Sequence, residues 1–172
     1  MLIQRGFTLI ELLITIAIVA ILAALAAPSF KVMLANAQIR TAAQASFDGL
    51  QLARVEAIRR NQRVMFIKGA NSSWDVTVES GSVAVQSRTS ADGSPSVTMV
   101  ATPTDATKVT FDGLGRVKPN TDASSTISQI DADVPVSLIP AASSRELRIT
   151  ISSGGAIRLC DPGAPSGSST GC

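Results

Sequence analysis

The chain has 172 residues, which is room for one small domain and an extended helix. Its 15 Lys and Arg against 13 Asp and Glu give a net charge of +2, so the total charge provides no argument for nucleic acid binding. With no His and two Cys, the sequence excludes Ser-His-Asp and Cys-His catalysis and a structural zinc site, and we expect no catalytic residue, metal or cofactor.

The segment from Phe7 to Ala27 is apolar except for Glu11, and about 20 apolar residues suffice to span a bilayer as a helix. Arg5 precedes it and the next basic residue is Lys31, which predicts a cytoplasmic N-terminus and a periplasmic body on a single-pass inner-membrane anchor. The alternative is a cleaved secretory signal ending at the small residues Ala24 to Ala27. The length of the segment and its carboxylate argue against that alternative.

Glu11 is the most informative residue of this segment. An ionised carboxylate inside hydrocarbon costs roughly 2.5 to 3.5 kcal/mol, and the segment holds no cation to offset it. The compensating charge must therefore come from another chain or from a free amino terminus. A cut after Gly6 would create such a terminus four residues away.

The stretch from Arg5 to Leu13, RGFTLIELL, resembles the prepilin motif of type IV pilins and type II secretion pseudopilins. The resemblance implies that a prepilin peptidase removes a cytoplasmic leader, residues 1–6, and N-methylates Phe7. It also implies that Thr8 and Glu11 act in assembly, where Glu11 neutralises the amine of a neighbouring subunit. Before assembly, inner-membrane lipid would surround this transmembrane and assembly helix, residues 7–28.

Pro28 ends the apolar run and resembles the proline that kinks pilin helices where they leave the membrane. A mid-helix proline removes one hydrogen bond and clashes with the preceding turn, so a bend is expected, with a simple helix stop as the alternative.

An amphipathic helix is predicted for residues 29–61, packed on the body. Three- and four-residue spacing indicates an apolar stripe that consists of Val32, Ala35, Ile39, Ala42, Ala43, Phe47, Leu50, Ala53 and Ala57. Basic residues near its end, Arg54, Arg59, Arg60 and Arg63, are typical of a nucleic acid patch but also suit a helix C-terminus, and Glu56 is placed to pair with Arg59 or Arg60. We favour the interpretation that these basic residues stabilise the helix C-terminus.

From residue 62 to residue 160 the pattern changes to short β-rich runs between turn residues, which predicts an antiparallel β domain. In the final hairpin, Ile149 and Leu159 can share a face only across an odd-numbered loop, of three or five residues after Ile151. The fold class is therefore α+β, with a long N-terminal helix, one half membrane-spanning and one half amphipathic, packed on a body that is a single antiparallel β-sheet. With the resemblance it is a type IV pilin fold. The predicted strands are 63–68, 74–79, 83–88, 97–101, 108–112, 134–139, 145–151 and 156–160.

The tail, residues 161–172, is rich in Gly, Pro and Ser yet ends in a cysteine. The two cysteines of the chain, Cys160 and Cys172, could form one disulfide bond in an oxidising compartment. The alternative is that both remain free thiols in a reducing compartment.

Two further segments, Thr110 to Val117 and Gly154 to Pro162, resemble the GspH/FimT group of pilus minor pilins and type II secretion minor pseudopilins. The Cys-Asp-Pro ending resembles the pilus members. The implied function is a minor pilin that helps to initiate or cap a type IV pilus, with the major pilin and other minor pilins as partners. A minor pseudopilin of type II secretion, with pseudopilin partners, is the alternative.

A third alternative is a competence pilin that captures DNA through Arg116, Lys118 and Arg158. Some members of the group carry a Gly-Arg-x-Arg motif near the last strand, but here Ala156 occupies the place of the first arginine. The run from Gly115 to Lys118 fits that spacing better but lies in an earlier loop, where a turn explains the glycine. DNA is therefore not favoured as a partner.

Overall fold

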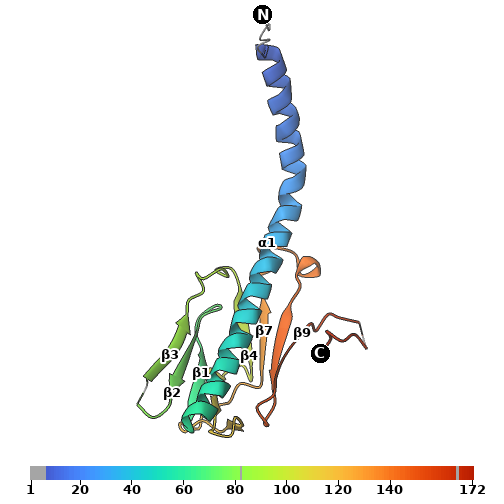
Figure 1. Ribbon diagram of the computed structural model, residues 1–172. Helices are drawn as coiled ribbons and strands as arrows, with labels where there is room; N and C mark the ends of the chain where they lie inside the picture. The colour runs from blue at the N-terminus through green and yellow to red at the C-terminus, as the bar shows by residue number, and fades with distance from the viewer. Residues whose placement is uncertain (1–6, 82, 166) are drawn as a thin grey trace, which may run out of the picture.

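The computed structural model describes residues 7–81, 83–165 and 167–172. Its long helix α1, Leu9–Arg60, projects far beyond a β-rich body and curves gently along its length (Figure 1). The helix continues through Pro28, so this proline does not end it. It ends where Asn61 adopts the left-handed conformation and its N–H bonds to the carbonyls of Ala57 and Ile58.

Within the described residues, nine strands form two antiparallel sheets, and both lie against the second half of α1 (Figure 1). The first sheet has the order β3-β2-β1-β5-β6 and the second the order β4-β7-β8-β9. The elements are β1 Val64–Lys68, β2 Trp74–Val78, β3 Val83–Arg88, β4 Thr98–Thr102, β5 Lys108–Phe111, β6 Val117–Lys118, β7 Gln129–Asp133, the short 3-10 helix η1 Ala141–Ser143, β8 Leu147–Ile151 and β9 Ile157–Cys160.

The packed half of α1, residues 35–57, supplies one side of the core. Its buried positions repeat at three- and four-residue spacing, as the apolar stripe predicts, and Ile39 and Leu50 are fully buried. Gly49 also lies on this face, because a Cβ there would come within 3.0 Å of the Trp74 indole. A glycine costs about 1 kcal/mol in a helix relative to alanine, and here it makes room for the largest side chain of the core.

The β8–β9 hairpin has the register that the apolar pattern requires. Ile149 pairs with Leu159 and Ile151 with Ile157, across a five-residue loop, Ser152–Ala156. The loop is closed by a bond from the Ser152 N–H to the Ala156 carbonyl, at 2.9 Å. The five-residue alternative is therefore the correct one, and the apolar side chains share the face towards α1.

The predicted strand at 134–139 is wrong. These residues form a turn, because Pro135 has no N–H for a sheet ladder and the Leu138 N–H bonds back to the Pro135 carbonyl. The strand in this region is β7, which we had not predicted because its sequence, QIDAD, contains two acids. Ile130 and Ala132 of β7 are buried, and the acids point to the other face.

The single sheet that the sequence suggests is, in the described ranges, two sheets. The α+β class itself is confirmed.

Candidate functional site

The first half of α1 is a fully exposed apolar surface. Every residue from Phe7 to Lys31 is exposed, and Phe7 keeps 82% of its surface. By length and composition this helix could cross a membrane, and none of the apolar window is buried in the protein. We call residues 7–34 the projecting half. Because monomeric proteins rarely expose apolar patches of this size, the surface must be covered by lipid or by other chains.

The N-terminus of α1 is capped by the motif residues themselves. The hydroxyl of Thr8 accepts a hydrogen bond from the Glu11 N–H, at 3.3 Å, which satisfies one of the free donors of the first turn. Glu11 lies in that first turn, where the helix dipole favours negative charge. Among the described residues no cation lies within ion-pair distance of its carboxylate. Gly6 and the leader, residues 1–6, lie outside the described residues.

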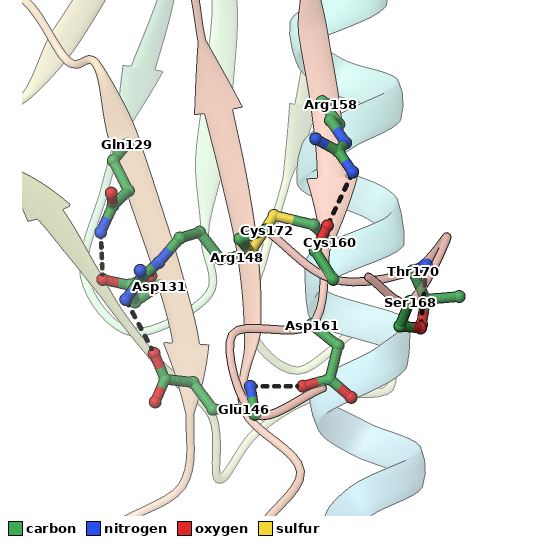
Figure 2. The surroundings of a disulfide bond; sticks show 12 residues. Gln129, Asp131, Glu146, Arg148, Arg158, Cys160, Asp161, Ser168, Thr170 and Cys172 are labelled. Atoms are coloured by element: carbon green, nitrogen blue, oxygen red, sulfur yellow. Dashed lines mark hydrogen bonds and ion pairs between the residues drawn. A yellow bond between two sulfur atoms is a disulfide. The ribbon is translucent and has the colours of Figure 1, made fainter. Parts of the chain in front are cut away.

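The tail at the other end of the chain is tied to the last strand. Cys160 and Cys172 form a disulfide bond, in agreement with the predicted pairing (Figure 2). Arg158 donates a hydrogen bond to the Gly171 carbonyl at 2.6 Å, and the Asp161 N–H bonds to the Thr170 carbonyl at 2.8 Å. The composition of the tail is that of a flexible linker, but these contacts close it into a loop on β9.

A charged cluster on the outer face of the second sheet was missed at the sequence level. Arg148 lies 2.6 Å from Asp131 and 3.6 Å from Glu146 (Figure 2). Burial raises the pKa of Glu146, and the carboxylate of Asp131 adds to this effect. Asp131 and Asp133 both belong to β7 and not to a loop. The alternation of apolar and acidic residues from Gln129 to Asp133 was the signal that could have revealed the strand.

The three candidate DNA contacts have local structural partners. Arg116 and Lys118 lie 3.4 and 3.9 Å from the carboxylate of Asp112. Hydrogen bonds from the Arg116 and Leu114 N–H groups and the nearby cations lower the pKa of Asp112, so it stays ionised beside them. Arg158 instead holds the tail loop. The geometry therefore gives no support to DNA binding through these residues.

The two C-terminal signature segments meet in space at the end of α1. Gly115 and Gly155 both have positive φ angles, +73° and +82°, and a Cβ on Gly155 would overlap the Gly115 carbonyl. The same carbonyl accepts a hydrogen bond from Arg54 Nε at 3.1 Å, and the Val117 N–H bonds to the Ser153 carbonyl at 3.1 Å. The glycines thus lock the helix end, the turn before β6 and the β8–β9 hairpin together.

Comparison with known families agrees with this geometry. A family model described as type II transport protein GspH matches residues 42–155, which is more than half of the chain and includes most of the body. The chain belongs to the GspH family. A second model, the prokaryotic N-terminal methylation motif, matches residues 1–27 of this GspH-family protein. The chain is therefore type IV pilin-like, and its family and fold are those of structural subunits and not of enzymes.

A curated relative and two solved structures are also similar to the GspH-family chain. A fimbrial protein of Moraxella nonliquefaciens is 43% identical over 72 residues, and the match covers 42% of this chain and 45% of that protein. Two crystal structures of the Pseudomonas aeruginosa type IV minor pilin FimU are each 20% identical, with TM-scores of 0.49 and 0.47. They cover 76% and 75% of this chain, and 90% and 94% of their own.

The family and the motif together imply processing by a peptidase and assembly with other pilins or pseudopilins. The exposed apolar helix is consistent with a single-pass membrane anchor.

Proposed function

We propose that this protein is a minor pilin that helps to initiate or cap a type IV pilus. In this proposal a prepilin peptidase cuts the precursor between Gly6 and Phe7 and N-methylates Phe7. The observation that carries the proposal is the projecting half of α1, which is apolar and exposed and begins with the methylation motif. Such a surface on a small body has no role in the fold of its own chain, and it suits a subunit whose helix packs among other helices.

The body lies in the periplasm in this proposal, where the Cys160–Cys172 disulfide bond can form and persist. Inner-membrane lipid covers residues 7–28 before assembly, and the helices of the major pilin and other minor pilins cover them afterwards. Pro28 lies at the passage from the membrane to the packed half. The leader, residues 1–6, stays cytoplasmic until it is removed.

Glu11 supplies the assembly chemistry. A carboxylate in hydrocarbon costs several kcal/mol unless it is paired, and the amine of Phe7 in a neighbouring subunit is the charge that would neutralise it. The Thr8 cap fixes the first turn around Glu11, so the carboxylate extends from an ordered helix end. Assembly then pairs the Glu11 carboxylate with the Phe7 amine of the neighbouring subunit away from water. This ion pair favours the axial offset between neighbouring subunits that brings the two groups together.

The Glu11→Ala variant tests this role, with Asp48→Ala as a matched control, because Asp48 is an exposed acid on the packed half of the same helix. Mass spectrometry should show normal processing of both variants. Immunoblots of sheared fibres should show at least a ten-fold loss of Glu11→Ala and wild-type recovery of Asp48→Ala. The loss follows because the ammonium group of Phe7 in the neighbouring subunit is left without its partner in hydrocarbon, at a cost of roughly 2.5 to 3.5 kcal/mol. Normal incorporation of Glu11→Ala would overturn the pairing.

The Gly6→Ala variant tests the processing site. It should retain residues 1–6, so that its mass exceeds that of the mature wild-type protein by the mass of the leader. A mature mass identical to wild type would place the cut elsewhere.

A second candidate function is that of a minor pseudopilin in type II secretion, which the match to the family of the type II transport protein GspH favours. The match to a fimbrial protein favours the pilus instead. A deletion strain separates them, because loss of a minor pilin should reduce surface pili while leaving secreted enzymes at wild-type levels. Unchanged pili with loss of secretion would favour the pseudopilin.

A further inference from the structure

The end of the body nearest the projecting half contains a loop that is fastened to α1. Residues 134–146 connect β7 to β8, and we call them the collar loop. The loop lies beside the helix where the projecting half meets the packed half (Figure 1). Asn36 donates a hydrogen bond to the Ser143 carbonyl at 3.0 Å and accepts one from the Arg145 N–H at 2.8 Å. The loop therefore has a fixed height along the helix, at the level of Asn36.

The collar loop exposes apolar side chains between two buried anchors. Val134 and Ile139 are buried, while Val136, 75% exposed, and Leu138, 44% exposed, lie between them. Phe30, Met33 and Leu34 are exposed on the adjoining stretch of α1. The anchors hold the loop in place, so its exposed valine and leucine are ordered apolar side chains of a loop that is hydrogen-bonded to α1 at Asn36.

The height of the loop corresponds to the headgroup layer of a membrane. Lys31 is the first charged residue after Glu11, and it marks where the helix leaves the hydrocarbon. Asn36 lies five residues further on, about 8 Å along the helix axis. A headgroup layer is about 5 to 8 Å thick on each side of the hydrocarbon, so the collar loop is at its outer edge and enters it when the helix tilts by roughly 20°.

The charges around the loop are mixed. A hollow of ≈ 560 Å³ between α1 and the loop is lined by Arg40 and Arg145 together with Asp161. A neighbouring hollow of ≈ 530 Å³ shares Arg145 and Asp161 and adds Asp133 and Glu146. In the described part of the chain neither Arg40 nor Arg145 has a carboxylate within 4.0 Å.

We propose that the collar loop seats the body on the periplasmic surface of the membrane by contacting zwitterionic phospholipid headgroups before assembly. Val136 and Leu138 enter the interface, and the guanidinium groups of Arg40 and Arg145 bind a lipid phosphate. The acids of the neighbouring hollow suit the ammonium group that follows the phosphate in a zwitterionic headgroup, whereas a purely anionic surface would be repelled by them. This inference rests on the membrane anchoring in the proposed function.

Continuity favours lipid over a second protein as the occupant. Met33 of the projecting half and Arg145 of the collar loop line the same hollow, so the loop lies next to the end of the apolar helix that lipid covers in the proposed function. Seating would also fix the rotation of the body about the helix axis, so that the surface for the next subunit faces one direction along the membrane.

The experiment uses the full mature chain in nanodiscs of phosphatidylethanolamine and phosphatidylcholine, with a quencher attached to the lipid headgroups in one set of discs and deep on the acyl chains in a second set. A fluorophore is placed on Val136→Cys, on Ile18→Cys to report anchoring, and on Leu114→Cys as an exposed apolar control at the opposite end of the body, where the neighbouring Gly113 contacts Asn61. The headgroup quencher should quench the probe at Val136, the deep acyl-chain quencher should quench the probe at Ile18, and both should leave the probe at Leu114 bright. A second variant, Leu138→Asp combined with the labelled Val136→Cys, should lower the seated population about ten-fold, because it removes the burial of one large apolar side chain.

The outcomes are separable. If the Ile18 probe is not quenched, the anchoring fails, and with it both the proposed function and this inference. If the Ile18 probe is quenched and the Val136 probe is as bright as the Leu114 probe, the helix is anchored but the collar loop does not contact lipid. That result would overturn this inference and favour a contact of the loop with another subunit. Quenching at Val136 that requires phosphatidylglycerol would overturn the zwitterionic assignment. Circular dichroism and the intact disulfide bond verify folding of each variant.

Discussion

The two halves of α1 lie in opposite environments. Ile18 of the projecting half is exposed, while Ile39 of the packed half is completely buried. The difference is one of periodicity: the first half is apolar on all sides, and the second half has polar residues opposite its stripe. A helix with a stripe folds onto its own chain, whereas a helix that is apolar all round requires cover from outside.

The largest expected effect separates these halves directly. Ile39→Ala should lower the free energy of unfolding by about 2 to 5 kcal/mol, because it opens a cavity in the core, while Ile18→Ala should leave it within about 0.5 kcal/mol of wild type. Chemical unfolding of the full chain in detergent, followed by the fluorescence of the buried Trp74, measures both. Equal destabilisation by the two variants would show that the projecting half contributes to the fold of the body.

Removal of the disulfide bond is expected to act on the body alone. Cys160→Ser with Cys172→Ser should cost on the order of 3 kcal/mol, because the loop of the unfolded chain is no longer closed. The same unfolding measurement applies, and reduction of the wild-type protein is the independent check. Membrane insertion of the projecting half should be unaffected, and a parallel loss of insertion would break the separation of the two regions.

The glycine lock at the end of the packed half can be tested by a matched pair. Gly155→Ala should destabilise by about 1 to 3 kcal/mol, because the new methyl group overlaps the Gly115 carbonyl and the φ angle is left-handed. Gly154→Ala meets its nearest neighbour at 3.8 Å and should be tolerated. Comparable melting temperatures for the two variants would contradict the close packing.

The smallest effect concerns the exposed side of the packed half. Hydrogen bonds from Arg59 and Arg60 lower the pKa of Glu56 from 4.5 to about 2, so its ion pairs stabilise the folded state above pH 4.5, and this contribution is lost as the pH falls towards 2. Glu56→Gln should therefore lower the free energy of unfolding by less than about 1 kcal/mol at pH 7, because the arginines are partly exposed. Below pH 2 it should not change the free energy of unfolding. Thermal melts of both proteins across this range measure the difference, and a pH-independent gap would argue against the ion pairs.

The sequence was informative wherever one local pattern decides the structure. The capped helix end at Asn61 and the hairpin around Ser152–Ala156 follow from local spacing and from the need to bury both sides of a pair. β7 has only one local signal, the alternation of apolar and acidic residues from Gln129 to Asp133, and its acids resemble a loop until Arg148 of the neighbouring strand is known to pair with Asp131. The division into two sheets depends on pairings between distant segments, which no local pattern contains.

The candidate site divides in the same way. The motif around Thr8 and Glu11 is continuous in sequence and could be predicted in full, although the pairing of Glu11 stays a prediction because its partner belongs to another chain. The collar loop could not be predicted, because it depends on Asn36 meeting residues more than 100 positions away.

The uninterrupted course of α1 has a mechanical consequence. Because one hydrogen-bonded rod runs from Leu9 to Arg60, tension applied at the projecting end is transmitted into the body along the helix axis. The force then acts parallel to the interface between the packed half of α1 and the two sheets. The contacts along this interface therefore share the force. The lock of Gly115 and Gly155 lies at the far end of that rod, where it resists withdrawal of the helix from its groove.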